Sequence, residues 1–145
     1  QDYFKLDVDS PYMMMVAPVA DKRQRQMTTE ESALFGIDKL NIQRSDIPAV
    51  THVDYSARIQ TVDENSNPRF FALLRSMKHK YQSPIIINTS FNVRGEPIVM
   101  TPSQAYTCFM RTEMDILVLG NCVLYKEQQP KIKDSHKWKK EYALD

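Results

Sequence analysis

Apolar runs alternate with polar stretches along this chain and predict strands and helices in mixed order. Residues 12–19 form an apolar run that predicts a strand ending near Pro18. Residues 49–53 and 57–62 flank a short polar turn and together predict a β-hairpin. Residues 115–120 and 122–125 predict a second pair of strands, because Gly120 and Asn121 favour a tight turn between them.

Two helices are predicted where a capping residue and a proline precede apolar positions at helical spacing. Thr101 and Pro102 begin one of them, which carries Ala105 and Phe109. The other begins at Asn67-Pro68, and its apolar stripe comprises Phe70, Leu73, Leu74, Met77 and Tyr81.

The polar stretch 21–46 predicts a surface loop that could act as a lid. It contains one short helix, since Thr28 and Glu31 have the spacing of a capping box and Gly36 stands where that helix would end. From all these elements we expect an α/β fold with a mixed, twisted sheet and helices packed mainly on one face.

Residues 85–87, three isoleucines after Pro84, form a β-branched apolar run that predicts a buried strand over residues 84–88. Small polar side chains follow at once, Asn88, Thr89, Ser90 and Asn92, and then Arg94. Open α/β sheets bind ligands just beyond the carboxyl ends of buried strands. The sequence therefore predicts a ligand site in this stretch.

Composition narrows the class of protein. A hydrophobic content of 42% and a charged content of 26% are ordinary for a globular chain of 145 residues. The net charge is only +1, which argues against a broad basic surface for nucleic acid. No apolar run approaches the roughly 20 residues of a membrane span, so we expect a cytoplasmic protein. We expect Cys108 and Cys122 to be buried, reduced thiols.

Several segments recur in the order and spacing of the NodU/CmcH family of O-carbamoyltransferases, namely residues 10–14, 48–62, 67–68, 85–102 and 114–120. The chain therefore resembles the carboxyl-terminal part of these proteins. We expect a domain over residues 1–128 and a polar, lysine-rich tail over residues 129–145. Because the family's proteins are several times longer and this chain begins at Gln1, we expect a piece of such a protein that contains an incomplete domain.

The resemblance implies an activity. These enzymes use ATP to move a carbamoyl group from carbamoyl phosphate to a hydroxyl of a small molecule, through carbamoyl-adenylate. A YrdC-like carboxyl-terminal domain forms the adenylate with ATP and Mg²⁺. An amino-terminal actin/ASKHA-like domain, which holds iron or another metal, then transfers the group. This chain is thus expected to bind carbamoyl phosphate and ATP, to hold no metal of its own, and not to complete transfer alone.

The alternative is a YrdC-like module that binds RNA or nucleotide without turnover. The small net charge makes the nucleic-acid version the weaker of the two hypotheses.

Arg58 is the candidate phosphate-binding residue. It lies on the predicted strand 57–62, and a planar guanidinium suits bidentate recognition of phosphate. The structural alternative is a surface arginine on a strand. Arg94 is a second candidate cation, for the phosphates of the nucleotide.

Ser90 and Asn92 are the candidates for binding the carbamoyl end, since a hydroxyl and a primary amide both donate and accept hydrogen bonds. The resemblance implies the same role, because Ser90-Phe91-Asn92 matches a Ser-x-Asn element of YrdC-like proteins. A polar turn that caps its own backbone is the alternative. We expect Ser90 and Asn92 to face a cleft with Arg58, while Phe91 points into the protein.

His52 and Asp54 are two residues apart, so they would share one face of a strand. They could belong to a metal site or form a base with an orienting carboxylate, although two ligands are too few for a metal. A packed histidine is the structural alternative. His52 is kept as a candidate for ligand contact.

Overall fold

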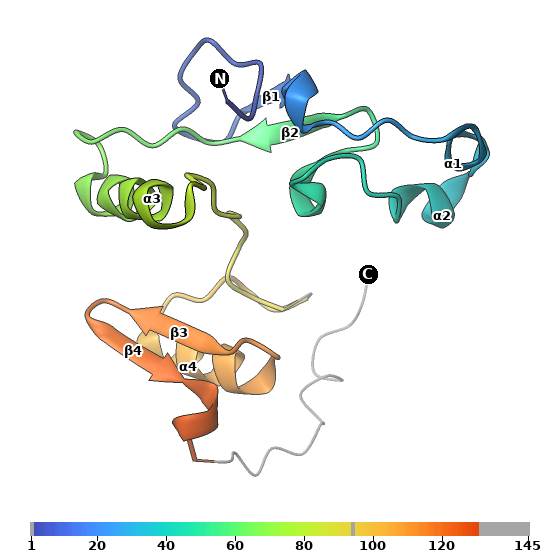
Figure 1. Cartoon of the computed structure of the whole chain (residues 1–145). Coiled ribbons are helices and arrows are strands. Elements are labelled where there is room, and N and C mark those ends of the chain that lie inside the picture. The colour runs from blue at the N-terminus through green and yellow to red at the C-terminus, as the bar shows by residue number, and fades with distance from the viewer. Residues whose placement is uncertain (1, 94, 131–145) are drawn as a thin grey trace. The chain divides into compact units, whose positions relative to one another are not determined.

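The computed structural model describes residues 2–93 and 95–130, and the chain divides into two compact units, Gln1–Ile87 and Asn88–Asp145. The described residues of each unit form one two-stranded antiparallel sheet (Figure 1). The prediction of mixed helices and strands is confirmed. The single mixed, twisted sheet is not, because the described strands form two small antiparallel sheets. The domain boundary at residue 128 stays a prediction, and residues 131–145 of the tail lie outside the described residues.

The first unit is built on β1 (Met15–Pro18) and β2 (Ser56–Ile59), which pair with Met15 opposite Ile59. Ala17, Val19, Ala57 and Ile59 are buried around this pair. The predicted hairpin between residues 49–53 and 57–62 is wrong. The earlier run enters a 3-10 helix, η2 (Pro48–Val50), whose proline cannot donate to a β-ladder, and β2 pairs with β1 instead.

The stretch between β1 and β2 carries η1 (Asp21–Arg23), α1 (Thr29–Ala33) and α2 (Gly36–Leu40), and Figure 1 shows α1 and α2 side by side. The Thr28–Glu31 capping box is present as predicted. Gly36 does not end that helix but begins α2, and its φ of 62° provides the turn between them. The Arg25 amide donates to the Arg44 carbonyl at 2.7 Å and joins the two ends of the excursion.

The predicted helix after Asn67 is α3 (Pro68–Tyr81). Asn67 accepts a hydrogen bond from the Phe70 amide, and the proline occupies the first turn, as predicted. The helix contributes no buried side chain, and Leu73 on its apolar stripe is 49% exposed.

The prediction of a buried strand over residues 84–88 is wrong. No described strand includes these residues, and Ile87 is 62% exposed. An apolar run becomes a strand only where a neighbouring strand satisfies its N–H and C=O groups. None of the described strands pairs with this segment, which ends at the boundary between the units.

The second unit packs α4 (Pro102–Arg111) on the hairpin of β3 (Ile116–Leu119) and β4 (Cys122–Tyr125), followed by η3 (Lys126–Gln128) (Figure 1). Both the hairpin and the helix start at Thr101 are confirmed predictions. Ala105, Phe109 and Leu117 form the buried core. Cys108 is buried as predicted, whereas Cys122 is exposed, so that part of the cysteine prediction is wrong.

Candidate functional site

The predicted site residues are distributed over both units. His52 and Arg58 belong to the first unit, and residues 88–92 belong to the second. Arg94 lies outside the described residues.

Arg58 lies on β2 opposite Val16 and is exposed, while its neighbours Ala57 and Ile59 are buried. Its Nη2 atom lies 3.4 Å from the sulfur of Met13. Among residues 2–93 and 95–130, no carboxylate forms an ion pair with it. A thioether is a weak and uncharged hydrogen-bond acceptor. This contact therefore does not neutralise the positive charge of the guanidinium, which can still attract an anion.

The turn that carries Met13 is fastened to the end of β2 by Ser10. The buried Ser10 hydroxyl donates to the Ile59 carbonyl at 2.9 Å, and the Ser10 amide donates to Thr61 Oγ1 at 2.8 Å. Met13 has a φ of 58°, a left-handed conformation that such a side chain adopts only where surrounding contacts impose it. Ser10 thus helps to position Arg58 through the turn that carries Met13. Both residues belong to the segment 10–14 of the family pattern, which is how the sequence could have indicated them.

His52 is linked to Asp54 through Ser56. The His52 Nδ1 atom lies 2.9 Å from Ser56 Oγ, and that hydroxyl donates to Asp54 Oδ1 at 2.6 Å. The Ser56 amide donates to the same oxygen at 3.0 Å. These two bonds from Ser56, the side-chain one foremost, hold the pKa of Asp54 below its ordinary value. The expectation of a shared strand face is wrong, because His52 and Asp54 lie in the turn before β2.

The polar segment of the second unit is a loop closed by its own hydrogen bonds. Asn92 Nδ2 donates to the Val93 carbonyl at 3.1 Å and to the Glu96 carbonyl at 2.8 Å, and the Val99 amide donates to the Phe91 carbonyl at 2.9 Å. The amide nitrogen of Asn92 is thereby used within the turn, whereas these bonds leave its Oδ1 atom unused.

The side chains around Asn92 face two environments. Phe91 is half-buried and packs against the core of Ala105, Phe109 and Leu117, in the inward position that we expected. Residues 88–90, with the Asn88 amide and the Thr89 and Ser90 hydroxyls, are exposed. Phe91 therefore anchors the loop while the preceding residues stay accessible.

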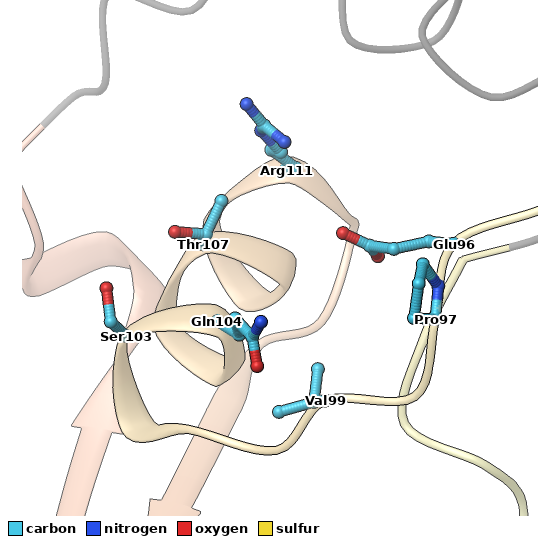
Figure 2. Close-up of a pocket in the computed structure, with 7 residues that line it drawn as sticks. All are labelled: Glu96, Pro97, Val99, Ser103, Gln104, Thr107 and Arg111. Atoms are coloured by element: carbon cyan, nitrogen blue, oxygen red, sulfur yellow. The ribbon is translucent and has the colours of Figure 1, made fainter.

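A pocket of about 270 Å³ lies between α4 and the segment that ends this loop, and sequence reasoning missed it. Figure 2 shows Glu96 and Pro97 on one side and the helix side chains on the other. Gln104 Oε1 accepts from the Met100 and Thr101 amides, so it belongs to the helix cap. The lining also includes a guanidinium, so the pocket carries charges of both signs; its residues are Glu96, Pro97, Val99, Ser103, Gln104, Thr107 and Arg111.

Within residues 2–93 and 95–130, no group of three or more His, Cys, Asp or Glu side chains is placed to hold a metal ion. Burial raises the pKa of the Cys108 thiol, which disfavours a thiolate there.

None of the described helices has the length and apolar character that crossing a membrane requires.

The profile of the family described as "Carbamoyltransferase C-terminus" matches residues 1–126. The chain belongs to this family. The uncharacterized protein sll1178 of Synechocystis sp. is 56% identical over 144 residues, which are 99% of this chain and 23% of that protein. Nodulation protein NolO of Bradyrhizobium diazoefficiens is 44% identical over 78 residues, 54% of this chain and 14% of the relative.

A further relative is the 3'-hydroxymethylcephem-O-carbamoyltransferase of Amycolatopsis lactamdurans, 40% identical over 57 residues, 39% of this chain and 11% of the enzyme. The chain spans about a quarter or less of the length of these relatives. The family resemblance found in the sequence is thus confirmed, and the chain is a carbamoyltransferase C-terminus that includes residues of both units.

Proposed function

We propose that this chain is the donor-activating part of an ATP-dependent O-carbamoyltransferase. It binds carbamoyl phosphate and ATP and forms carbamoyl-adenylate, and an amino-terminal actin/ASKHA-like domain of the same polypeptide passes the carbamoyl group to a hydroxyl of a small molecule. That domain would hold iron or another metal. The family match over residues 1–126, with a relative named as an O-carbamoyltransferase, is the observation that carries the proposal.

Arg58 binds the phosphate of the donor. The proposal is supported by its exposure on a paired strand and by the absence of an ion-paired carboxylate among the described residues. A fixed guanidinium binds a phosphate dianion through two parallel hydrogen bonds. Catalysis is then mainly positioning and charge neutralisation, as phosphoryl chemistry requires.

The remaining candidates recognise the carbamoyl group and the nucleotide. Asn88, Thr89, Ser90 and the Oδ1 atom of Asn92 supply donors and acceptors that match a planar amide. His52 contacts the donor, and Arg94 contacts the nucleotide phosphates.

The nucleotide must be bound without a P-loop, since no two of the chain's glycines, Gly36, Gly95 and Gly120, have the five-residue separation that this motif needs. ATP supplies the adenylyl group of the product. The described residues fit Mg²⁺ only as an ion carried on the nucleotide phosphates, because no cluster of acids among them forms a cage. A YrdC-like fold for the complete domain belongs to the same proposal.

Thermal unfolding of the 145-residue chain with carbamoyl phosphate, Mg-ATP and RNA in separate samples tests this function. At a hundredfold excess over Kd, carbamoyl phosphate should add about 2.7 kcal/mol of apparent stability. Inorganic phosphate is the control for a nonspecific anion effect and should add less. Stabilisation by RNA alone would favour the nucleic-acid alternative, and no response to carbamoyl phosphate at any concentration would contradict the proposal.

A further inference from the structure

The Asp54–Ser56–His52 chain contains one hydroxyl proton between two atoms that could each accept it. Ser56 Oγ lies 2.6 Å from Asp54 Oδ1 and 2.9 Å from His52 Nδ1. A serine hydroxyl has a single hydrogen, so it can donate to one of these neighbours only. The protonation of the imidazole ring depends on which neighbour receives that hydrogen.

The carboxylate receives it. Asp54 is ionised at neutral pH, since hydrogen bonds from Ser56 lower its pKa, and an ionised carboxylate can only accept. A separation of 2.6 Å is typical of a hydroxyl donating to a carboxylate, and two bare oxygens at that distance would repel. Ser56 Oγ must then accept from His52, which requires a hydrogen on Nδ1.

We propose that Asp54 and Ser56 hold His52 as the Nδ1–H tautomer, so that Nε2 is the ring nitrogen that accepts hydrogen bonds and protons. His52 is exposed, so its ring can meet a ligand, whereas Ser56, whose hydroxyl lies against Nδ1, is buried. Asp54 and Ser56 are positioning residues, because they act on a ligand only through the imidazole.

This order of residues differs from that of a serine nucleophile. A nucleophilic serine gives its proton to the histidine, whereas here Nδ1 already carries a hydrogen and Ser56 donates to Asp54. Ser56 is therefore held as a relay, and the reactive atom of the group is Nε2 of His52.

A neutral Nε2 accepts and cannot donate, so it selects a ligand group that carries an N–H or O–H. Carbamoyl phosphate has such a group at its amino end and none on its phosphate dianion. We therefore assign His52 to the amino end of the donor, an assignment that rests on the proposed function. The tautomer itself does not depend on that function.

Nitrogen-15 NMR of the 145-residue chain at about pH 8.5, where an ordinary imidazole is largely neutral, reads the tautomer directly. Two-bond correlations from the ring protons distinguish a protonated nitrogen from a bare one, and His52→Gln identifies the His52 signals. We expect the proton on Nδ1 of His52. His79, exposed on α3, is the internal control and should show the Nε2–H form that free histidine prefers. A His52 signal like that of His79 would overturn the proposal.

Two variants separate positioning from mere packing. Asp54→Ala frees the Ser56 hydroxyl to donate to Nδ1, so the tautomer should reverse although serine and histidine both remain. Ser56→Ala removes the acceptor, and His52 should revert to the form seen in His79. Ser76→Ala on exposed α3 is the matched control and should change nothing. Retention of the Nδ1–H form in both site variants would contradict the relay, provided that circular dichroism shows an intact fold.

The ligand assignment is tested by titration with carbamoyl phosphate and with inorganic phosphate. Carbamoyl phosphate should shift Nε2 of His52, and inorganic phosphate should shift the Arg58 side chain while leaving that nitrogen unchanged. If carbamoyl phosphate shifts Arg58 but not Nε2, His52 does not meet the amino end and the assignment fails. If neither residue responds, the proposed function fails together with the assignment, and the tautomer result stands on the first measurement.

Discussion

The two candidate segments, residues 52–58 and residues 88–96, are held in different ways. The first leads into β2, whose ladder with β1 fixes the backbone around Arg58, and Ser10 fastens the neighbouring turn. The second belongs to no described strand. It depends on the Phe91 ring in the core of its unit and on the bonds from Asn92 to its own turn.

Within the first segment, residues 56–58 are preorganised by strand pairing, and preorganised groups bind ligands at a lower entropic cost. Residues 88–96 depend on one packed ring and a few local bonds, which is typical of the less stable regions of a protein. We therefore expect substitutions to affect the two segments through different mechanisms.

Disruption of the core that supports the second segment should cause the largest loss of stability. Phe109 is fully buried, and Phe109→Ala should cost about 3–5 kcal/mol through the lost ring and the cavity it leaves. Hydrogen exchange should show the loss at the amides of Leu117 and Leu124, with a much smaller change at Ala57 in the first unit.

Phe35→Ala is the matched control, because the Phe35 side chain is 92% exposed, and it should cost less than about 0.5 kcal/mol. An equal loss of protection in both units after Phe109→Ala would show that the two segments do not have separate supports.

Arg58→Ala should weaken the binding of carbamoyl phosphate without weakening the fold. One charge-assisted contact is worth about 1.5–3 kcal/mol, or roughly a ten- to hundredfold rise in Kd measured by calorimetry. Arg58→Lys keeps the positive charge but loses the planar guanidinium that can make two parallel hydrogen bonds to phosphate, so an intermediate Kd is expected. Arg69→Ala removes another exposed arginine of the first unit and should leave Kd unchanged. Equal effects of the two alanine variants would remove Arg58 from the site.

Asn92→Ala and Ser90→Ala should separate support from ligand contact in the second segment. The first change removes two hydrogen bonds inside the turn and should cost about 1 kcal/mol of local stability, seen as faster exchange of the Glu96 and Val99 amides. Ser90 is exposed, so its loss should weaken donor binding and leave exchange unchanged. Faster exchange in Ser90→Ala would mean that the hydroxyl supports the loop.

Acidification should affect the first segment through Asp54, and this effect is the smallest. Its folded-state pKa is lowered by the bonds from Ser56, so it stabilises the fold above its unfolded pKa and loses that contribution as pH falls through the folded pKa. The difference in free energy of unfolding between wild type and Asp54→Asn should therefore shrink below about pH 4. A difference that is the same at every pH would contradict the role given to this carboxylate.

Local structure was predictable because its signals are local. Thr28 with Glu31, Asn67 with Pro68 and Gly120 with Asn121 each form the cap or turn that their spacing indicates. The pairing of β1 with β2 was not predictable in this way, because the partners are separated by the long excursion 21–46. Sequence patterns favour near neighbours as partners, and the false hairpin followed from that preference.

The candidate site shows the same limit. The exposure of Arg58 follows from strand alternation, and the Asn92 cap was one of the two roles that its residue type allowed. The hydrogen bonds of Ser56 to His52 and Asp54 form only because the chain turns before β2. In that turn Tyr55 has a φ of 65°, which no sequence pattern indicated. The apolar run after Pro84 predicted a buried strand, but Ile87 is exposed and no described strand pairs with this segment. A strand needs a partner, and sequence periodicity does not report partners.

Chemical-shift mapping of the 145-residue chain during titration with carbamoyl phosphate tests the donor-binding role most directly. We predict that the Arg58 side chain and the amides of Ser90 and Asn92 shift together with a single Kd, while α3 stays unchanged. Inorganic phosphate should shift Arg58 more weakly and leave Ser90 and Asn92 unchanged. Shifts confined to residues outside both segments, or no shifts at saturating donor, would contradict the donor-binding role proposed for these residues.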